Sequence, residues 1–287
     1  MGQLSLEKAN QLYPYKSDNL WFLMHAYNEE RCIERCLRSV LPYTKDIVIG
    51  IDDRTSDKTE EIAKSFGAHT FPFKWIHSFS YAKNLCLETA MSFGLQYGEW
   101  VLFMGADFEM INLEMEFIKD PLNFFGQFEV PEYHKEGTQY VTRNRKLLWR
   151  HHPYIYWERL VHEEAVYSAY RLTGLGIVFG NASWKQLPMV GEMMHYGFFE
   201  DGGEHGEVFW RKKSYYVILT QLGRIMSRCN LPETQDGIIR ALRIALNNEK
   251  INDIETTING LITRYQNGDI PQGLSPYTPQ EVNAEHE

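Results

Sequence analysis

A single carboxylate follows an apolar run in the stretch VLFMGADFEM, residues 101–110. Four apolar residues lead into Gly105 and Ala106, and Asp107 then supplies the carboxylate. Proteins hold Mg²⁺ or Mn²⁺ through one or two carboxylates, while phosphate oxygens and waters complete an octahedron. One aspartate at the end of a strand can therefore be enough to hold a divalent cation against a diphosphate.

Two other acid-rich segments also follow apolar runs. HAYNEE (25–30) follows LWFLM, and DDRTSD (52–57) follows IVIGI. A carboxylate such as Asp52 can accept hydrogen bonds from the N–H of a base or from a ribose hydroxyl. Glu29 also suits the first turn of a helix, where the helix dipole favours negative charge. Asp57 is placed to cap the next helix, and we expect that role for it rather than a chemical one.

The chain alternates short apolar runs with segments whose apolar residues recur at helical spacing. The runs occupy 20–24, 47–51, 69–73 and 100–104, and the helical segments occupy 33–41, 57–66 and 80–97. This alternation predicts parallel strands joined by right-handed crossovers, with helices on both faces of the sheet. Ligands bind such sheets beyond the carboxyl ends of the strands, which is where the acid-rich segments fall. From Trp210 onward the spacing again predicts helices.

The composition is that of an ordinary globular protein. Among 287 residues, 44% are hydrophobic and 23% are charged, which excludes a disordered tail protein. A net charge of -9 argues against tight nonspecific binding to nucleic acid or to an anionic membrane. No apolar run is long enough to span a bilayer, and the N-terminus lacks the pattern of a signal peptide, so we expect a soluble, cytoplasmic protein without a membrane span. The four cysteines have no CxxC spacing and are expected to be buried, reduced thiols.

Four segments, in order, resemble the family-2 glycosyltransferases. They are FLMHAYNEERCIERCLRSV, IGIDDRTSDKTEEIA, FSYAKNLCLETA and WVLFMGADFE. The resemblance covers Leu20 to Asp107 and continues more loosely through RLVHEE (159–164) and MMHYG (193–197). It implies an α/β protein with the GT-A fold of nucleotide-diphospho-sugar transferases, a three-layer mixed sheet with a C-terminal helical extension. We expect a GT-A catalytic domain over 1–205 and the helical extension over 206–287.

The resemblance implies which residues bind the nucleotide sugar. They are Asn28, Glu29, Asp52, Asp53, Lys83, Asn84, Gly105, Ala106 and Asp107. Asp52 stands where the family has an aspartate that hydrogen-bonds the base or ribose. Lys83 stands where a cation would suit a diphosphate, although the family often has Arg there and Lys is a point charge rather than a bidentate fork.

The family's usual Asp-x-Asp signature is incomplete, because Gly105 takes the first position and only Asp107 remains. In related enzymes the second aspartate is the direct metal ligand, so the loss falls on the less essential partner. His195 resembles the late histidine that completes the metal site in several GT-A enzymes, and His205 in GGEHGE is its rival. Imidazole suits Mn²⁺ better than Mg²⁺, so we expect Mn²⁺, or else Mg²⁺, as cofactor.

The acceptor hydroxyl needs a general base. Glu163 is the candidate by its position in the family, since partial burial can raise a carboxyl pKa toward neutrality. His162, Glu164 and Asp201 are alternatives, and a structural role for Glu163 in a salt bridge or cap also stays open.

Two groups in the middle of the chain have either a binding or a structural interpretation. Arg143 and Arg145 could bind a diphosphate or an acidic acceptor, or could belong to a solvated hairpin. Tyr154, Tyr156 and Trp157 could stack on a sugar ring, although aromatic clusters more often belong to a core.

The resemblance thus implies a metal-dependent glycosyltransferase. It would move a sugar, with inversion, from a UDP- or GDP-sugar to a hydroxyl of a glycan, a protein or another acceptor. One alternative is a catalytically degenerate GT-A protein that only binds nucleotide sugars. A sugar nucleotidyltransferase is a lesser alternative, because HAYNEE lacks the glycine-rich, basic character of a triphosphate loop. The C-terminal helices offer a surface for a homodimer.

Overall fold

The structure, a computed structural model, describes residues 17–121, 123, 125–132, 141–152, 155–161, 164–167, 189–196 and 207–274. The chain divides into two compact units. Unit 1 comprises residues 1–75, 82–157 and 165–203, and unit 2 comprises residues 76–81, 158–164 and 204–287. Two short segments from within the expected catalytic domain therefore join the C-terminal helices. The assignment of functions to 1–205 and 206–287 stays a prediction.

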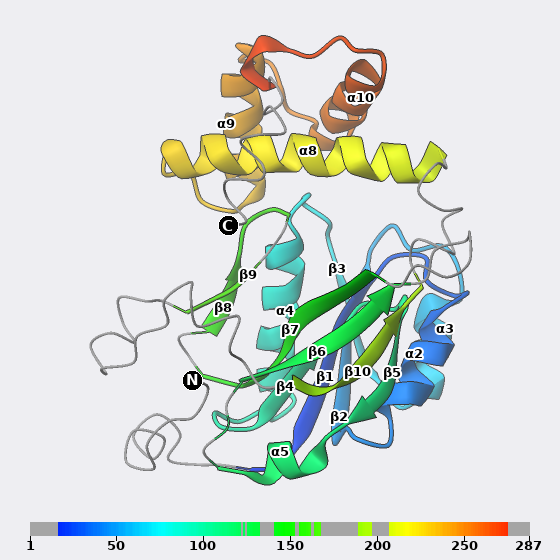
Figure 1. Cartoon of the computed structure of the whole chain (residues 1–287). Helices are drawn as coiled ribbons and strands as arrows, with labels where there is room; N and C mark the ends of the chain where they lie inside the picture. The colour runs from blue at the N-terminus through cyan, green and yellow to red at the C-terminus, as the bar shows by residue number, and fades with distance from the viewer. Residues whose placement is uncertain are drawn as a thin grey trace. The chain divides into compact units, whose positions relative to one another are not determined.

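An eight-stranded mixed sheet forms the centre of unit 1 (Figure 1). Its strand order is β3-β2-β1-β4-β7-β6-β10-β5. The strands are β1 (Leu20–Ala26), β2 (Asp46–Asp52), β3 (His69–Phe73), β4 (Trp100–Phe103), β5 (Phe108–Leu113), β6 (Phe125–Glu132), β7 (Val141–Arg150) and β10 (Met189–His195). The first four are parallel, β7 is antiparallel to β4 and β6, and β10 pairs parallel with β6 and antiparallel with β5. The predicted α/β class with a mixed sheet is confirmed.

Helices cover both faces of this sheet, as predicted. Alternate residues of β1 separate into two apolar cores, because successive side chains of a strand point to opposite faces. Phe22 packs in one core with α2 (Ile33–Val40) and α3 (Thr59–Ser65). Leu23 packs in the other with α4 (Phe79–Ser92), which lies across the sheet from α2 and α3 in Figure 1. Burial on both faces explains why the strands are continuous apolar runs in the sequence.

The observed ends of α3 and α4 differ from those predicted from the sequence. Asp57 accepts a hydrogen bond from the backbone N–H of Thr59, the first residue of α3, at 3.0 Å. Lys58 occupies the N-cap position and carries no side-chain capping bond, so the expected cap at Asp57 falls one residue too early. The predicted helix from 80 to 97 is too long, because α4 ends at Ser92. Gly94 has a φ of +110° there, a conformation that glycine adopts without steric cost.

A buried arginine at the end of β7 connects several loops of unit 1, and the sequence did not predict this role. Arg150 ends β7 with only 1% of its surface exposed. Its guanidinium donates to the backbone carbonyls of five residues, Ser17, Gly98, Ile118, Asp120 and Asn123. Because burying a charge is costly unless it is hydrogen-bonded, this set of carbonyls is what makes the position tolerable.

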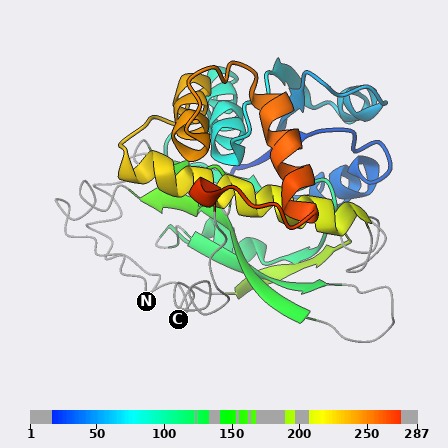
Figure 2. The ribbon, with the colours of Figure 1, turned by 90° about the horizontal axis from the view of Figure 1, so that it is seen from above.

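Unit 2 is built around three helices, α8 (Glu207–Arg228), α9 (Gln235–Leu246) and α10 (Ile254–Gln266), as the sequence predicted. Figures 1 and 2 show α9 and α10 crossing one side of the long α8. Thr234 caps α9 and Asp253 caps α10, each through a side-chain oxygen. The apolar faces of the helices enclose a core that also contains Leu160 and Val161 from the short segment 158–164.

The short elements complete the described chain. They are α5 (Met115–Lys119), β8 (Ile155–Glu158), β9 (Glu164–Tyr167) and the 3₁₀ turn η2 (Gln272–Leu274). The four cysteines are free, and three are buried as predicted, but Cys229 is exposed near the end of α8.

Candidate functional site

Asp107 and His195 meet at the end of two strands of unit 1. The Nε2 atom of His195 lies 3.0 Å from the Oδ2 atom of Asp107. Asp107 sits between β4 and β5, and the antiparallel pairing of β5 with β10 places His195 opposite Phe108. The imidazole stacks on the Phe108 ring at 4.3 Å between centroids. The sequence therefore identified two residues, 88 positions apart, that the fold brings into contact.

Gly105 leaves room for the Asp107 carboxylate. A Cβ atom added at Gly105 would lie 2.7 Å from the Oδ1 atom of Asp107, closer than real Cβ contacts allow. The Gly105 carbonyl also accepts a long hydrogen bond from the Cys36 thiol, at 3.5 Å. Burial, and after it the nearby charge of Asp107, raise the pKa of Cys36 well above its ordinary value, which keeps the thiol protonated as a donor. The absence of a side chain at Gly105, the first position of the signature, thus leaves the space that the Asp107 carboxylate occupies.

The loops after β1 and β2 are tied to one another. Asn28, in the left-handed region with a φ of +53°, accepts a hydrogen bond from the N–H of Ser56 at 2.9 Å. The N–H of Glu29 donates to the Thr59 hydroxyl at 2.7 Å. The carboxylate of Glu29 accepts a hydrogen bond from the Cys32 thiol at 3.0 Å. These contacts give Asn28 and Glu29 a clear role in shaping the loop.

Asp52 is almost completely covered. Only 3% of its side chain is exposed, and the Arg54 guanidinium forks onto both of its oxygens at 2.9 and 2.7 Å. Arg54 in turn lies 4.9 Å from the Tyr27 ring and 5.8 Å from the Trp75 ring. Asp53 is exposed beside it. A ligand can therefore reach the Asp52 carboxylate only after Arg54 has moved.

Lys83 and Asn84 both contact Trp157. The Lys83 ammonium lies 3.9 Å from the Trp157 ring centroid and 4.9 Å from that of Phe103, with 8% of the residue exposed. The Asn84 amide bonds the backbone of Trp157 in both directions, at 2.9 and 2.8 Å. Trp157 itself is buried against Phe103 and Trp149. Trp157 therefore belongs to a core, one of the two interpretations that the sequence left open, and Asn84 fixes its position.

Several sequence candidates lie outside the described residues or their side chains. Glu163, His162, Asp201, His205 and Tyr154 fall outside the described chain, and the side chains of Arg143, Arg145 and Glu164 are not described. Ala106 is buried and belongs to the apolar core, and its role toward the nucleotide sugar stays a prediction. Tyr156 is 39% exposed.

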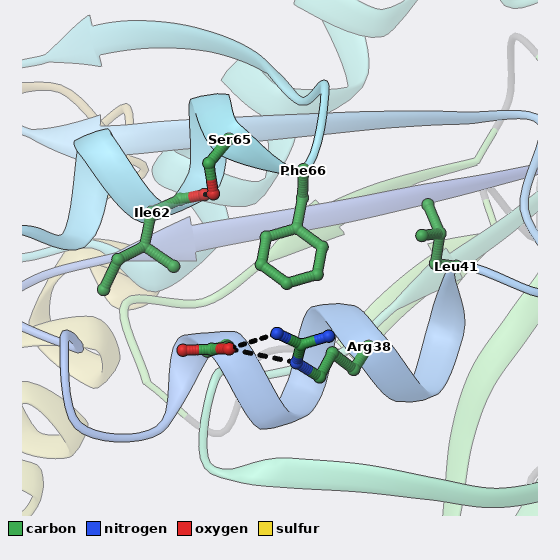
Figure 3. Close-up of a pocket in the computed structure, with 6 residues that line it drawn as sticks. Arg38, Leu41, Ile62, Ser65 and Phe66 are labelled. Carbon is green, nitrogen blue, oxygen red and sulfur yellow. Dashed lines mark hydrogen bonds and ion pairs between the residues drawn. The ribbon is translucent and has the colours of Figure 1, made fainter.

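Two other kinds of site are relevant in the described part of the chain: a pocket lined by candidate residues and a cluster of metal ligands. A groove of about 460 Å³ lies between α2 and α3 (Figure 3), and Arg38 on its wall is paired with Glu34 at 2.5 Å. None of the candidate residues lines this groove. Within the described ranges, no three His, Cys, Asp or Glu side chains gather in a way that could hold a metal ion. Among the described helices, none combines the length and apolar character needed to cross a membrane.

Comparison with known families and proteins matches a part of the chain that contains Asp107 but not His195. Residues 21–160 match the model of Glycosyl transferase family 2. The SPbeta prophage-derived glycosyltransferase SunS of Bacillus subtilis (strain 168) is 30% identical over 145 residues, 48% of this chain and 32% of SunS. The chain thus spans about a third of the length of that relative. A TPR repeat-containing protein of Synechococcus elongatus is 31% identical over 84 residues, 29% of this chain and 19% of that protein.

Among solved structures, the similarity is loose. Glucosyl-3-phosphoglycerate synthase of Mycobacterium tuberculosis, solved with Mn²⁺ and UDP-glucose, is 18% identical, with a TM-score of 0.27, over 47% of this chain and 49% of that one. A superposition this loose carries no information about substrate or metal.

Proposed function

Residues 21–160 belong to glycosyl transferase family 2, and from this premise we propose that the chain is a metal-dependent transferase. It moves a sugar from a nucleotide-diphosphate donor to an acceptor hydroxyl, with inversion at the anomeric carbon. The observation that carries the proposal is the 3.0 Å approach of Asp107 and His195 at the strand ends. A carboxylate and an imidazole placed together supply a partial ligand set that a diphosphate can complete.

The two side chains fit a divalent cation. Oδ2 of Asp107 and Nε2 of His195 lie 3.0 Å apart, so both atoms would be available to hold the same ion. The imidazole favours Mn²⁺ over Mg²⁺. When bound, the cation would neutralise charge on the leaving diphosphate.

The nucleotide is proposed to lie over the ends of β1, β2 and β4. Asp52 would accept hydrogen bonds from the base or ribose once Arg54 has withdrawn. Lys83 adds positive charge for the diphosphate from the first turns of α4. Asn28 and Glu29 shape the loop that borders the nucleotide, through their contacts with Ser56 and Thr59.

The acceptor hydroxyl is proposed to attack the anomeric carbon from the face opposite the diphosphate. Glu163, two positions after Val161 in RLVHEE, is the proposed general base on its sequence position alone. The acceptor itself, whether glycan, protein or another hydroxyl, is part of the same proposal. Homodimerisation through the C-terminal helices stays a prediction.

Turnover of UDP- and GDP-sugars, with and without EDTA, tests this function. We expect donor hydrolysis or transfer that requires Mn²⁺ and falls about 100-fold or more in Asp107→Ala, because one site of charge stabilisation is lost. Full turnover with EDTA present would refute metal dependence.

The missing first aspartate supports a second candidate function, in which the protein binds a nucleotide sugar without transferring the sugar. Gly105 leaves one carboxylate where the family signature has two. Titration calorimetry with Mn²⁺ and UDP or GDP separates the two functions, since binding without turnover across donors and acceptors favours the binding protein.

A further inference from the structure

Two short segments enter unit 2 through strained backbone. Segment 76–81 contains His77, with a φ of +62°, and segment 158–164 contains Arg159, with a φ of +81°. Residues other than glycine adopt this left-handed conformation at an energetic cost, and they keep it only where the surrounding structure enforces it. Both segments must therefore be held in place by contacts within unit 2.

Glu233, in the turn before α9, joins the two segments through one carboxylate. Its Oε2 atom accepts hydrogen bonds from the hydroxyls of Ser78, at 3.3 Å, and Ser80. Its Oε1 atom accepts the backbone N–H of Arg159 at 2.7 Å. Ser78 and Ser80 are 0% and 1% exposed, so their hydroxyls are shielded from water, whereas the bond to Arg159 is exposed. Each oxygen of Glu233 thus holds a different segment.

Segment 76–81 is also held by a helix cap at Ser78 and by the contacts of the buried His77 ring. The Ser78 hydroxyl accepts the N–H of Tyr81 at 3.1 Å, which caps α4, and the Glu233 charge beside this helix N-terminus is favoured by the helix dipole. The His77 ring, 4% exposed, contacts the Tyr215 hydroxyl and the Glu255 carboxylate, each at 2.9 Å. The helices of unit 2 therefore fix the point at which α4 begins.

The anchored residues are close in the chain to the candidate site. Ser80 and Lys83 are three positions apart in α4, so they are neighbours on one helix surface. Arg159 is two positions after Trp157, whose ring lies 3.9 Å from the Lys83 ammonium. A shift of either anchored segment would pass along the backbone and separate Lys83 from Trp157.

We propose that Glu233 is a positioning residue for Lys83: it fixes the start of α4 and the turn after Trp157, and so holds the Lys83 ammonium on the Trp157 ring. The C-terminal extension thereby sets the geometry of a cation in the catalytic part of the chain. The role of that cation toward the donor diphosphate rests on the proposed function, whereas the positioning itself does not.

Lysine acetylation followed by mass spectrometry tests the positioning in the whole 287-residue chain. In the native protein Lys83 should be protected, since 8% of it is exposed, while Lys45 and Lys119, with side chains 43% and 53% exposed, serve as internal references. In Glu233→Ala we expect the acetylation rate of Lys83 to rise about tenfold, with the reference lysines unchanged, because the anchored segments open locally.

Two more variants show whether exposure of Lys83 comes from loss of the Glu233 bonds or from general destabilisation of the fold. Glu233→Gln keeps the side-chain shape and one acceptor oxygen, and should expose Lys83 to an intermediate degree. Thr234→Ala is the matched control: it removes the cap of α9 next to Glu233 but no bond to either segment, and it should leave Lys83 protected. Unchanged protection of Lys83 in both Glu233 variants would overturn the proposal, as would equal exposure in Thr234→Ala.

Calorimetric titration of the same variants with UDP and Mn²⁺ separates this proposal from the proposed function. If Glu233→Ala exposes Lys83 and weakens UDP binding, both are supported. If it exposes Lys83 and leaves UDP affinity unchanged, the positioning is supported and the role of Lys83 toward the donor is refuted.

Discussion

Arg54 closes off Asp52: its guanidinium donates to both carboxylate oxygens, at 2.9 and 2.7 Å, and leaves 3% of the aspartate side chain exposed. A bidentate Arg–carboxylate pair is among the stronger polar contacts in proteins. If Asp52 recognises a base or ribose, the donor must first displace this arginine. Breaking the Arg54–Asp52 ion pair would then lower the affinity for the donor.

Arg54→Ala should consequently bind a nucleoside more tightly than the native chain does. Freed from its partner, Asp52 is available to the ligand without prior rearrangement, and we expect affinity for uridine or guanosine to rise about tenfold. Calorimetry measures it. Arg38→Ala, which breaks the exposed Arg38–Glu34 pair on α2, is the control and should change nothing. Weaker nucleoside binding by Arg54→Ala would show that Arg54 assists the ligand instead.

Restoring the family signature should harm this protein. In Gly105→Asp, and already in Gly105→Ala, the new Cβ would lie 2.7 Å from the Asp107 Oδ1 atom and push that carboxylate from its place. We expect Mn²⁺ affinity in the presence of UDP to fall about tenfold or more, since displaced ligands bind metal poorly. Mn²⁺ titration followed by electron paramagnetic resonance checks this, and tighter binding by Gly105→Asp would show that the second carboxylate is simply missing.

His151 should make the fold sensitive to acid. It is 2% exposed, and its burial, followed by the charge of His152, lowers its pKa from 6.5 to about 4 against the opposing effect of Glu99. Between these values the unfolded chain binds the proton and the folded chain does not. Stability is therefore full above pH 6.5 and is lost as pH falls toward 4, by about 3 kcal/mol. His151→Leu should remove this part of the dependence in urea unfolding at pH 4.5 and 7. An unchanged pH slope would assign the dependence to other groups.

Arg150→Met should destabilise unit 1 strongly. The substitution leaves the carbonyls of Ser17, Gly98, Ile118, Asp120 and Asn123 without their shared donor. Breaking a buried charged network of this kind costs about 3–5 kcal/mol. Thermal unfolding gives the measurement, with Arg38→Ala, whose side chain is 67% exposed, as the control. A loss below about 1 kcal/mol would mean that these carbonyls find other partners.

Much of the fold could be predicted because its signals are local. The apolar runs of β1, β2 and β4 are continuous since both faces are buried, and Asp57 marks the start of α3 to within two residues. The family motifs also brought Asp107 and His195 together. These signals depend on neighbours in the chain, or on a motif whose spacing is shared with other proteins.

The interactions that were missed are long-range ones between ordinary residues. Nothing near Glu233 in the sequence indicates that it binds Ser80 and Arg159, which are 153 and 74 positions away. Arg150 looks like any charged residue at a strand end until its carbonyl partners are assembled around it. Arg54 stands two positions from Asp52, yet nothing in the sequence shows that its guanidinium covers the aspartate. Such contacts become visible only when the fold sets the partners side by side.

Mn²⁺ binding in the presence of UDP, followed by electron paramagnetic resonance, tests the metal site most directly. Asp107→Asn and His195→Gln should each weaken Mn²⁺ binding about 10- to 100-fold or more. His69→Gln alters a similar His–Asp pair, His69 with Asp46 at 3.2 Å, and should bind Mn²⁺ as the native chain does. Native Mn²⁺ affinity in Asp107→Asn would contradict the account, because it would place the cation away from the one carboxylate on which the proposed function depends.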